Sequence, residues 1–539
     1  MLLLQCAGCV APGQIDENLV TRYQRSVLAR SPQKRLGKEG LDLLRPAAAE
    51  AGTFKTVKDK LTDRDGVQLS LDEAVRLAIS NSLDIRVVSF APAISREQMI
   101  QAAAAFDWVV FAGASHTRTD HHVETAFPHY RARSIPVEVG VRKSTVTGGT
   151  AELSWSLTRT SDNLVTTVLN PNYESLLSLQ LTQPLLRGAW PDYNLAALKI
   201  AQLSEKASAS QFRQTVEQVV AETQAAYWAL VQARRELQIQ DVLLEKTIQT
   251  RDRVEARLRM DATKVELKQA EAAVETRRAT LYRARQAIFD IQDRLARLLA
   301  TERMNPLRRC AIVPTTSPVT SKVNIDPTDQ LINALRHSPA MEQARLAIAA
   351  ADVQVGVAKN ETLPVLDLAA SVGAQGMNRV GGKAGGESLT FDYLDHSVGL
   401  LFEYPIGNRA AGAMLRQRKF EHLRSVTEMQ NTADAVAVNV RNALRQIETA
   451  FQEMKARKAA VAASQAQLTA LEDTERIRGR LTPEFLQLKL SSQEVLAAAE
   501  RAEIQTIVDF NTALARLAQI TGTTLQQKNI KLAVENSSR

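Results

Sequence analysis

Two stretches of the chain share one order of hydrophobic patterns. The stretch from Ser70 to Ser115 aligns without gaps onto Asp326 to Ser371 at a constant offset of 256 residues. In each stretch an apolar pattern of helical period ends at a turn, resumes as a second helix, and then changes to the alternating pattern of a strand. The sequence therefore predicts an internal repeat of helix, helix and strand.

Each repeat continues with an apolar strand that ends at a proline. The segment "LSLQLTQPLLRG" (Leu177 to Gly188) corresponds to "VGLLFEYPIGNR" (Val398 to Arg409). Proline cannot donate a hydrogen bond to a strand ladder, and a very long helical pattern follows each segment. We therefore predict a junction of sheet and helix in each repeat, marked by Pro184, Gly188, Pro405 and Gly407.

Long helices are predicted after both junctions. No proline occurs between Pro191 and Pro306, and apolar residues recur there at alternating steps of four and three, the period of a coiled coil. The core of an ordinary helical bundle fits the same spacing. The pattern therefore predicts packed helices but does not distinguish a coiled coil from a bundle. The seam residues are Phe212, Val216, Val219, Thr223, Ala226, Leu230, Ala233 and Leu237, then Val436, Val440, Ala443, Ile447, Ala450 and Met454.

Each long helical pattern must reverse direction, and the two repeats agree on where. Arg257 to Glu271 aligns with Arg476 to Leu490, and a threonine before Lys or Pro can cap the helix that follows. The first arm, about 66 residues, would span roughly 100 Å, and the shorter return arm leaves room for the helix before the first strand to stack on it. The predicted hairpin tips comprise Met260, Asp261, Ala262 and Thr263, and Gly479, Leu481, Thr482, Pro483 and Glu484.

The first repeat carries an extra hairpin within residues 135–158. Apolar and polar residues alternate on either side of a Gly148-Gly149 turn, as in a two-stranded hairpin. Segments of this kind are typical both of soluble sandwich strands and of transmembrane barrel strands. Because a strand pair flanked by long helices has no second sheet to cover its apolar face, closure with other copies of the chain is the preferred interpretation.

Composition and charge narrow the function classes. Aromatic residues are only 5%, and glycine is absent from Ala189 to Val355, so the chain is expected to be mainly α-helical. The net charge of +8 comes from 67 basic and 59 acidic residues interspersed at helical spacing, which excludes a nucleic-acid-binding surface. No run reaches the ~18 apolar residues of a membrane-spanning helix, so a membrane crossing would require a closed β-barrel.

The N-terminus resembles a bacterial lipoprotein signal. Ala7-Gly8 precedes Cys9, which would be the acylated residue, although Cys6 stands where such signals have leucine. The basic region and most of the apolar region of such a signal are missing, so the true start is expected upstream. A short disordered N-terminus is the alternative.

No metal site or cofactor is predicted. The Cys6/Cys9 pair lacks a second ligand pair, and the histidines at 116, 121, 122 and 129 have no helical ligand spacing. Motifs for dinucleotide binding, phosphate binding, zinc proteolysis and serine hydrolysis are absent from the sequence, so the chain is not expected to be an enzyme.

Together the repeat, "LSLDEAVRLAISNS", "LTQPLLRG", "EYPIGNRAA" and the hairpin tips resemble the TolC-like outer-membrane efflux protein family over residues 68–525. The resemblance implies a homotrimer in the outer membrane of a Gram-negative bacterium, with a 12-stranded β-barrel, four strands from each chain, continued by an α-helical coiled-coil barrel in the periplasm. It also implies outer-membrane lipid, a periplasmic adaptor and an inner-membrane pump as partners. The chain would then be a passive conduit for efflux or export.

The resemblance leaves several features open. In the family, acidic residues near the inner end of the tunnel form a constriction; Glu266 and Glu484 lie near the tips, but solvated helix charges fit them equally. The extra hairpin has no fixed place in a 12-stranded barrel. A periplasmic adaptor or a coiled-coil scaffold is the alternative function, and the transported substrate is not encoded in any motif.

The predicted domain order follows from these features. It is a leader and tether (1–67), a first repeat (68–305), a linker (306–325), a second repeat (326–525) and a C-terminal tail (526–539).

Overall fold

The computed structural model describes residues 67–122, 129–163, 168–259, 262–301, 311–478, 482–528 and 530. They form two compact units. The described residues within 67–87, 215–327 and 440–530 form unit 1, and those within 88–214 and 328–439 form unit 2. Among the described residues no single helix is long and apolar enough to cross a membrane, and only the bent pair Leu71–Asn81 and Leu83–Phe106 meets those criteria together.

The predicted order of helix, helix and strand is present in both halves of the chain. In the first half α3 (Leu71–Asn81) and α4 (Leu83–Ala103), with a short 3-10 turn (Ala104–Phe106), precede β2 (Trp108–Ala114). In the second half α8 (Pro327–His337) and α9 (Pro339–Asn360) precede β8 (Val365–Asn378).

Local capping explains where these helices begin. The side chain of Ser70 accepts a hydrogen bond from the backbone N–H of Glu73, which caps α3. Ser338 is the N-cap residue of α9, and Pro339 occupies the first turn, where its missing N–H costs nothing. The turn predicted between the two helices of the second repeat is thus confirmed, at Ser338 and Pro339.

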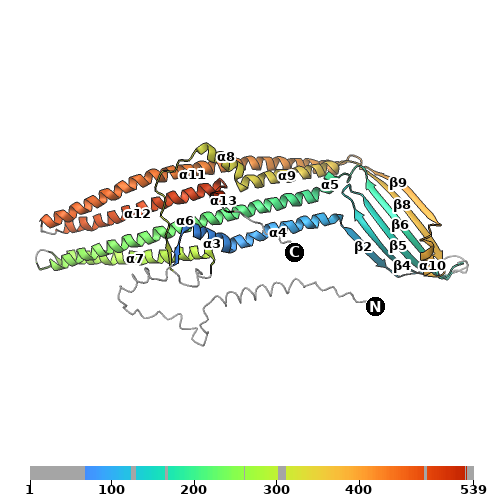
Figure 1. The fold of residues 1–539 in the computed structure, drawn as a ribbon, viewed down its shortest axis with the longest axis horizontal. Coiled ribbons are helices and arrows are strands. Elements are labelled where there is room, and N and C mark those ends of the chain that lie inside the picture. The colour runs from blue at the N-terminus through green and yellow to red at the C-terminus, as the bar shows by residue number, and fades with distance from the viewer. Residues whose placement is uncertain are drawn as a thin grey trace, which may run out of the picture. The chain divides into compact units, whose positions relative to one another are not determined.

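Unit 2 contains an antiparallel sheet with the strand order β2-β4-β5-β6-β8-β9 (Figure 1). A further strand, β3, pairs with β4 next to the end of β2. The remaining strands are β3 (Thr117–His122), β4 (His129–Ser144), β5 (Thr150–Asp162), β6 (Asn172–Pro184) and β9 (Leu394–Glu403). A short helix, α10 (Gly381–Glu387), contacts β5, β6 and β8 near one end of the sheet.

The hairpin predicted within residues 135–158 is confirmed, but the expected count of four sheet strands in each chain is wrong. The hairpin forms β4 and β5, and these two strands lie inside the sheet, between β2 and β6. Six strands therefore follow one another in a single sheet. The prediction failed because alternation identifies a strand locally, whereas its neighbours are chosen by pairing over long sequence distances.

Pro136 lies inside β4, a position that normally excludes proline because the ring removes a ladder donor. Its carbonyl accepts a hydrogen bond from the N–H of Ser115, in the break between β2 and β3. The register is the same for β2 and β3 and places Ser115 opposite Pro136, so the hydrogen bond that proline cannot donate is missing at the break between these two strands.

Two helical hairpins supply most of the remaining structure. The first is formed by α6 (Ala196–Ala256), preceded by the short α5 (Pro191–Asn194), and by α7 (Lys264–Leu299); the second is formed by α11 (Arg409–Arg478) and α12 (Pro483–Ile520), followed by α13 (Thr524–Gln527). The predicted arms of the first hairpin agree with these bounds. All predicted seam residues are buried except Phe212 and Leu237, which are half-buried.

The start of α4 lies beside the end of α7. The carboxylate of Asp84 is 3.7 Å from the guanidinium of Arg297, and α3 contacts α7. The shortness of the return arm led us to expect a helix at this position.

In unit 1 a short parallel strand pair is anchored to α6 by one tyrosine. β1 (Val67–Leu69) pairs with β7 (Ile312–Pro314), so part of the segment predicted as a linker is a strand. The fully buried hydroxyl of Tyr227 donates to the carbonyl of Leu69 (3.0 Å). It accepts from the backbone N–H groups of Thr315 (3.0 Å) and Thr316 (2.9 Å).

The Tyr227→Phe variant is expected to lose about 2 kcal/mol of local stability, because two backbone donors and one carbonyl lose their buried partner. Faster amide hydrogen exchange at Thr315 and Thr316 would measure this loss. Tyr282→Phe, at a side chain on α7 that is 49% exposed, is the matched control. Equal exchange at these amides in both variants would contradict the anchoring role.

Candidate functional site

The first predicted junction is a turn held by asparagine side chains. Pro184 is the last residue of β6, and Gly188 has a φ of 80°, a conformation that favours glycine. The N–H of Gly188 donates to the Asn360 side chain (2.7 Å), and its carbonyl accepts from the Asn194 side chain (2.8 Å). Asn360 ends α9, so one side chain ties this turn to the neighbouring helix.

The second junction also has a glycine with positive φ and an asparagine side chain that bonds the neighbouring backbone. Pro405 lies two residues beyond β9, and Gly407 has a φ of 85°. The side chain of Asn408 donates to the carbonyl of Thr362 (2.9 Å), just after α9. The N–H of Arg187 in the first junction also donates to the carbonyl of Pro364 (3.2 Å), so both junctions are fixed to the segment that connects α9 with β8.

Both hairpin tips use the predicted threonine caps. Thr263 caps α7 in a reciprocal capping box: its hydroxyl accepts from the N–H of Glu266 (3.3 Å), and the Glu266 carboxylate accepts from the N–H of Thr263 (2.6 Å). Thr482 caps α12 by accepting from the N–H of Phe485 (3.3 Å), with Pro483 in the first turn. The capping role of the two threonines is confirmed.

The acidic residues near the tips differ in environment. Glu266 is only 1% exposed and is occupied by the capping box, so it is not a solvated charge. Glu484 is exposed in the first turn of α12, where a negative charge stabilises the helix. Of the two, only Glu484 presents a carboxylate to solvent.

The two tips share one hydrophobic cluster. Val254 of α6 packs with Leu486 and Leu490 of α12, and the partly buried Ala262 packs against them. Four predicted tip residues, Met260, Asp261, Gly479 and Leu481, lie outside the described residues, as does Cys9.

A buried ion pair lies next to the tips. The ammonium of Lys489 on α12 bonds the carboxylate of Glu475 on α11, and the two side chains are only 3% and 10% exposed. The guanidinium of Arg253, on α6, lies 3.6 Å from the same carboxylate. Glu475 therefore connects both helices of the second hairpin to the first hairpin.

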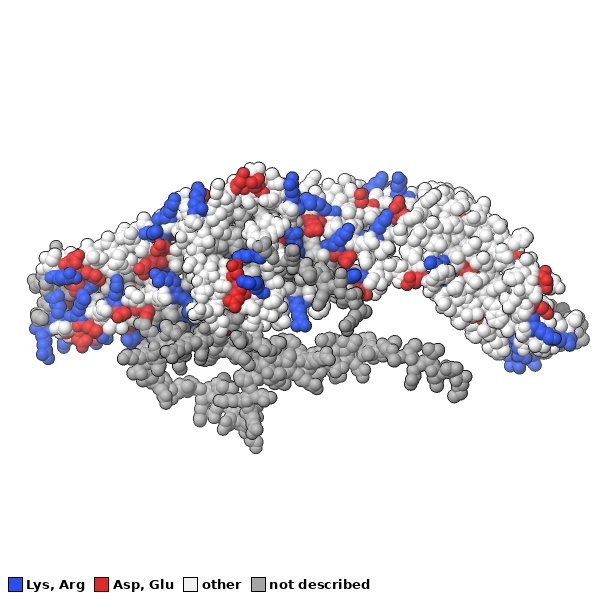
Figure 2. Space-filling view, viewed as in Figure 1, with Lys and Arg blue, Asp and Glu red and all other residues white. Residues whose placement is uncertain are grey.

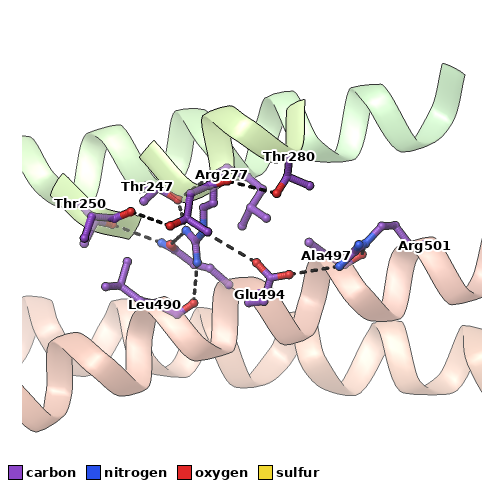
Figure 3. Close-up of polar contacts among 12 residues, drawn as sticks. Thr247, Thr250, Arg277, Thr280, Leu490, Glu494, Ala497 and Arg501 are labelled. Carbon is purple, nitrogen blue, oxygen red and sulfur yellow. Dashed lines mark hydrogen bonds and ion pairs between the residues drawn. The ribbon is translucent and has the colours of Figure 1, made fainter. Parts of the chain in front are cut away.

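A second polar cluster, which we call the Arg277 cluster, connects the hairpins through α7 (Figure 3). The guanidinium of Arg277, whose side chain is 9% exposed, donates to the carbonyl of Leu490 (2.8 Å) and to the side chain of Gln493 (3.0 Å) on α12. It also donates to the hydroxyl of Thr247 on α6. Gln493 donates in turn to Thr250 of α6 (3.2 Å).

The charge of Arg277 is only partly compensated. The Glu494 carboxylate lies 3.8 Å from its guanidinium but is half exposed and also bonds Arg501 (3.1 Å). Burial lowers the pKa of Arg277, and Glu494 opposes that shift. The cation on α7 is held mainly by neutral oxygens from two other helices, so its stabilisation depends on α6, α7 and α12 staying in place.

The sheet in unit 2 has two chemically distinct faces. Residues directly opposite each other on antiparallel strands share a face, so the pairing register assigns each side chain. The apolar face carries Trp108, Val110, Val137, Val139, Val141, Leu153, Trp155, Leu177, Leu179, Leu181, Val372, Val398, Leu400 and Phe402. The polar face carries Glu138, Arg142, Glu152, Ser154, Ser156, Ser178, Gln180, Ser371, Gln375 and Ser397, and the register also places the apolar side chains of Val109, Phe111, Leu176 and Leu401 on it.

Most of the apolar face is exposed in the single chain. Leu153, Leu179 and Val398 are 48%, 42% and 74% exposed, and α10 covers only the end near Trp155. Figure 2 shows few charged side chains over the middle of the sheet and several Lys and Arg residues at one end. At the opposite end of the strands the ammonium of Lys143 lies 4.6 Å from the ring of Trp108.

Sequence reasoning found the junctions, the caps and the alternation, but missed the two polar clusters and the junction asparagines. The residues of the two clusters lie on four helices, so no local sequence motif predicts them. Among the described residues no group of three or more His, Cys, Asp or Glu side chains is arranged to hold a metal ion.

Comparison with known proteins identifies the relatives of this fold. Residues 331–523 match a family model described as "Outer membrane efflux protein". A search among curated proteins finds no match.

Several solved structures share the fold. The outer-membrane channel OprN superposes with a TM-score of 0.64 at 17% identity, over 92% of this chain and 98% of that one. The Campylobacter jejuni CmeC outer-membrane channel gives 0.60 at 15% identity, over 93% and 99% of the two chains. The open state of the Neisseria gonorrhoeae MtrE outer-membrane channel gives 0.61 at 16% identity, over 84% and 89%.

Proposed function

We propose that this chain is the outer-membrane channel subunit of a tripartite efflux or export system. The premise is that residues 331–523 belong to the outer membrane efflux protein family. The chain acts as a passive conduit from the periplasm to the exterior. Its helices lie in the periplasm, and its sheet lies in the outer membrane. None of the matched descriptions names an enzyme.

The two-faced sheet is the observation that carries this proposal. A sheet with an exposed apolar face and a polar face suits a wall that has lipid on one side and water on the other. Because every backbone polar group must be paired in a membrane, the two edge strands must meet partners from other copies. We propose a homotrimer, closed by such edge pairing, built from two structural repeats in each chain.

The hairpin tips serve as the proposed gate and as the docking surface for a periplasmic adaptor, which in turn connects to an inner-membrane pump. An element that closes at rest and admits cargo must be bistable. Here the two hairpins are joined by two polar clusters, in which Arg277 and Glu475 each contact helices of both hairpins. Separating the hairpins breaks these contacts together, which gives closed and open states a defined energy difference.

Acylation of Cys9 belongs to the same proposal. A lipid on the N-terminus would add a second membrane anchor beside the sheet. Loss of acyl labelling in a Cys9→Ala variant, expressed with its natural leader, would support this assignment, and retained labelling would remove it.

The function is tested by extracting the full chain from outer membranes in detergent and reconstituting it in planar bilayers. The proposal requires a trimeric mass and stepwise ion conduction that an added periplasmic adaptor changes. A monodisperse monomer that conducts would contradict the trimer. A protein absent from the outer-membrane fraction would contradict the function itself.

The tip assignment predicts that Gly479→Leu lowers efflux or adaptor binding while trimer assembly and membrane insertion are retained, because a bulky side chain alters the docking surface. Cellular efflux of a dye, normalised to channel abundance, is the measurement. Gly382→Leu is the control, since a Cβ atom added at Gly382 on α10 meets nothing within 4 Å. Equal efflux by the Gly479 variant and the control at equal abundance would refute the assignment.

A further inference from the structure

The six-stranded order of the sheet has a consequence for how copies join. Each neighbouring pair is antiparallel, from β2 with β4 through to β8 with β9. With an even number of strands, the two edge strands β2 and β9 run in opposite directions. The β9 of one copy is therefore antiparallel to the β2 of the next copy when their edges meet, and the pattern continues without a break.

Both edges are open within the described chain. There β2 pairs only with β4, β9 pairs only with β8, and all ten residues of β9 are exposed (Figure 1). Leu400 and Phe402 on β9 are 67% and 66% exposed. An open edge with such side chains is a template for pairing, and a second copy of this chain offers the matching edge.

The β4–β5 hairpin is continuous with the rest of this sheet. β5 pairs with β6 from Thr150 to Thr160 and with β4 from Thr150 to Asp162. On the apolar face Leu153 lies between Val141 and Leu179; on the polar face Glu152 lies between Arg142 and Gln180. The alternation of faces therefore passes through the hairpin without a change of register.

We propose that β4 and β5 are strands of the barrel wall, so that three copies with six strands each close an 18-stranded barrel instead of one of 12. This inference rests on the proposed function. Inserting β4 and β5 between β2 and β6 does not change the relative direction of β2 and β6. These two strands run antiparallel with or without the inserted pair.

A wider lumen follows from the added strands. Barrel diameter grows about linearly with strand number, so the cross-section would be about twice that of a 12-stranded barrel. The added wall is lined by the polar face, including Glu138, Arg142 and Glu152. The membrane part of this channel would thus accommodate bulkier hydrated cargo than a four-strand subunit allows.

Cysteine labelling separates a wall hairpin from a hairpin outside the wall. Single variants Glu152→Cys and Leu153→Cys on β5 are compared with Gln180→Cys and Leu179→Cys on β6, their direct partners in the sheet. Each is built in a background without the three native cysteines (Cys6→Ser, Cys9→Ser and Cys310→Ser) and reconstituted in phosphatidylcholine vesicles, then treated with a membrane-impermeant maleimide. We expect the two polar-face variants to react and the two apolar-face variants to be protected by lipid.

The outcomes distinguish this inference from the function on which it rests. If Leu153→Cys reacts as readily as Glu152→Cys while the β6 pair keeps its contrast, the hairpin lies outside the wall and the inference is wrong. If Gln180→Cys and Leu179→Cys on β6 are also labelled equally, the sheet does not face lipid. Both the inference and the proposed membrane channel are then wrong.

A deletion tests the width directly. Removing residues 115–171 and joining β2 to β6 by a short glycine-serine linker leaves four strands in each chain. We expect the largest polyethylene glycol that enters from the outer side to decrease, in line with an about twofold smaller cross-section. An unchanged exclusion size in a trimeric, inserted variant would overturn the inference, and the cysteine variants test it independently if the deletion does not fold.

Discussion

The Lys489→Met variant is expected to destabilise the hairpin tips by about 3 kcal/mol, because it leaves the buried Glu475 carboxylate without its closest cation. Both side chains of this pair are nearly inaccessible, and Arg253 contacts Glu475 only from a more exposed position. Amide hydrogen exchange of residues 483–490, measured on the full-length protein in detergent, reports the free energy of local opening.

Two controls separate the charge effect from the loss of side-chain packing. Lys268→Met removes a 75% exposed lysine on α7 that pairs with Glu271, and a surface pair of this kind contributes at most about 1 kcal/mol. The double variant Lys489→Met with Glu475→Leu removes both charges and is expected to recover most of the loss. If the double variant is as unstable as the single variant, packing and not the buried charge explains the effect.

Replacing Arg277 with methionine is expected to open the proposed gate. Methionine keeps an apolar stem, but the carbonyl of Leu490 and the side chains of Thr247 and Gln493 lose their shared donor. Loss of hydrogen bonds to a buried cation weakens the closed state by about 2 kcal/mol, roughly a thirtyfold change in the ratio of closed to open channels. Single-channel recording in planar bilayers measures this ratio as the open probability.

Arg278→Met is the matched control, since Arg278 follows on the same helix, is 33% exposed and pairs with Glu275. Its open probability should stay close to that of the unmodified channel. Two results would exclude the Arg277 cluster as part of the gate: an Arg277→Met channel that gates normally, or one whose higher current comes only from a greater number of inserted channels.

Features encoded by residues close in sequence could be predicted. The caps at Thr263 and Thr482 depend on contacts three residues away, and the seam residues follow a short period, so local patterns were sufficient for both. Pro184 and Pro405 could be placed at junctions because proline ends a strand regardless of its partners.

Features that depend on distant partners could not be predicted. Arg277 reaches Thr247 on one helix and Leu490 on another, 30 and 213 residues away. Before folding it is one arginine among many on a charged helix. The β4–β5 hairpin was recognised from its alternation, but its place between β2 and β6 is decided by pairing with strands that the pattern does not name.

The open edge of β9 also allows two copies of the chain to pair incorrectly during assembly. Two β9 strands related by a two-fold axis would run antiparallel as well, so edge hydrogen bonding alone does not reject a symmetric dimer. Such a dimer places the strand-to-helix junctions of its two copies at opposite ends of the shared sheet. Only the unlike pairing of β9 with β2 keeps all copies in one orientation, so chains that pair through β9 before insertion reach a kinetic dead end. We therefore expect the yield of closed rings to fall when synthesis outpaces insertion.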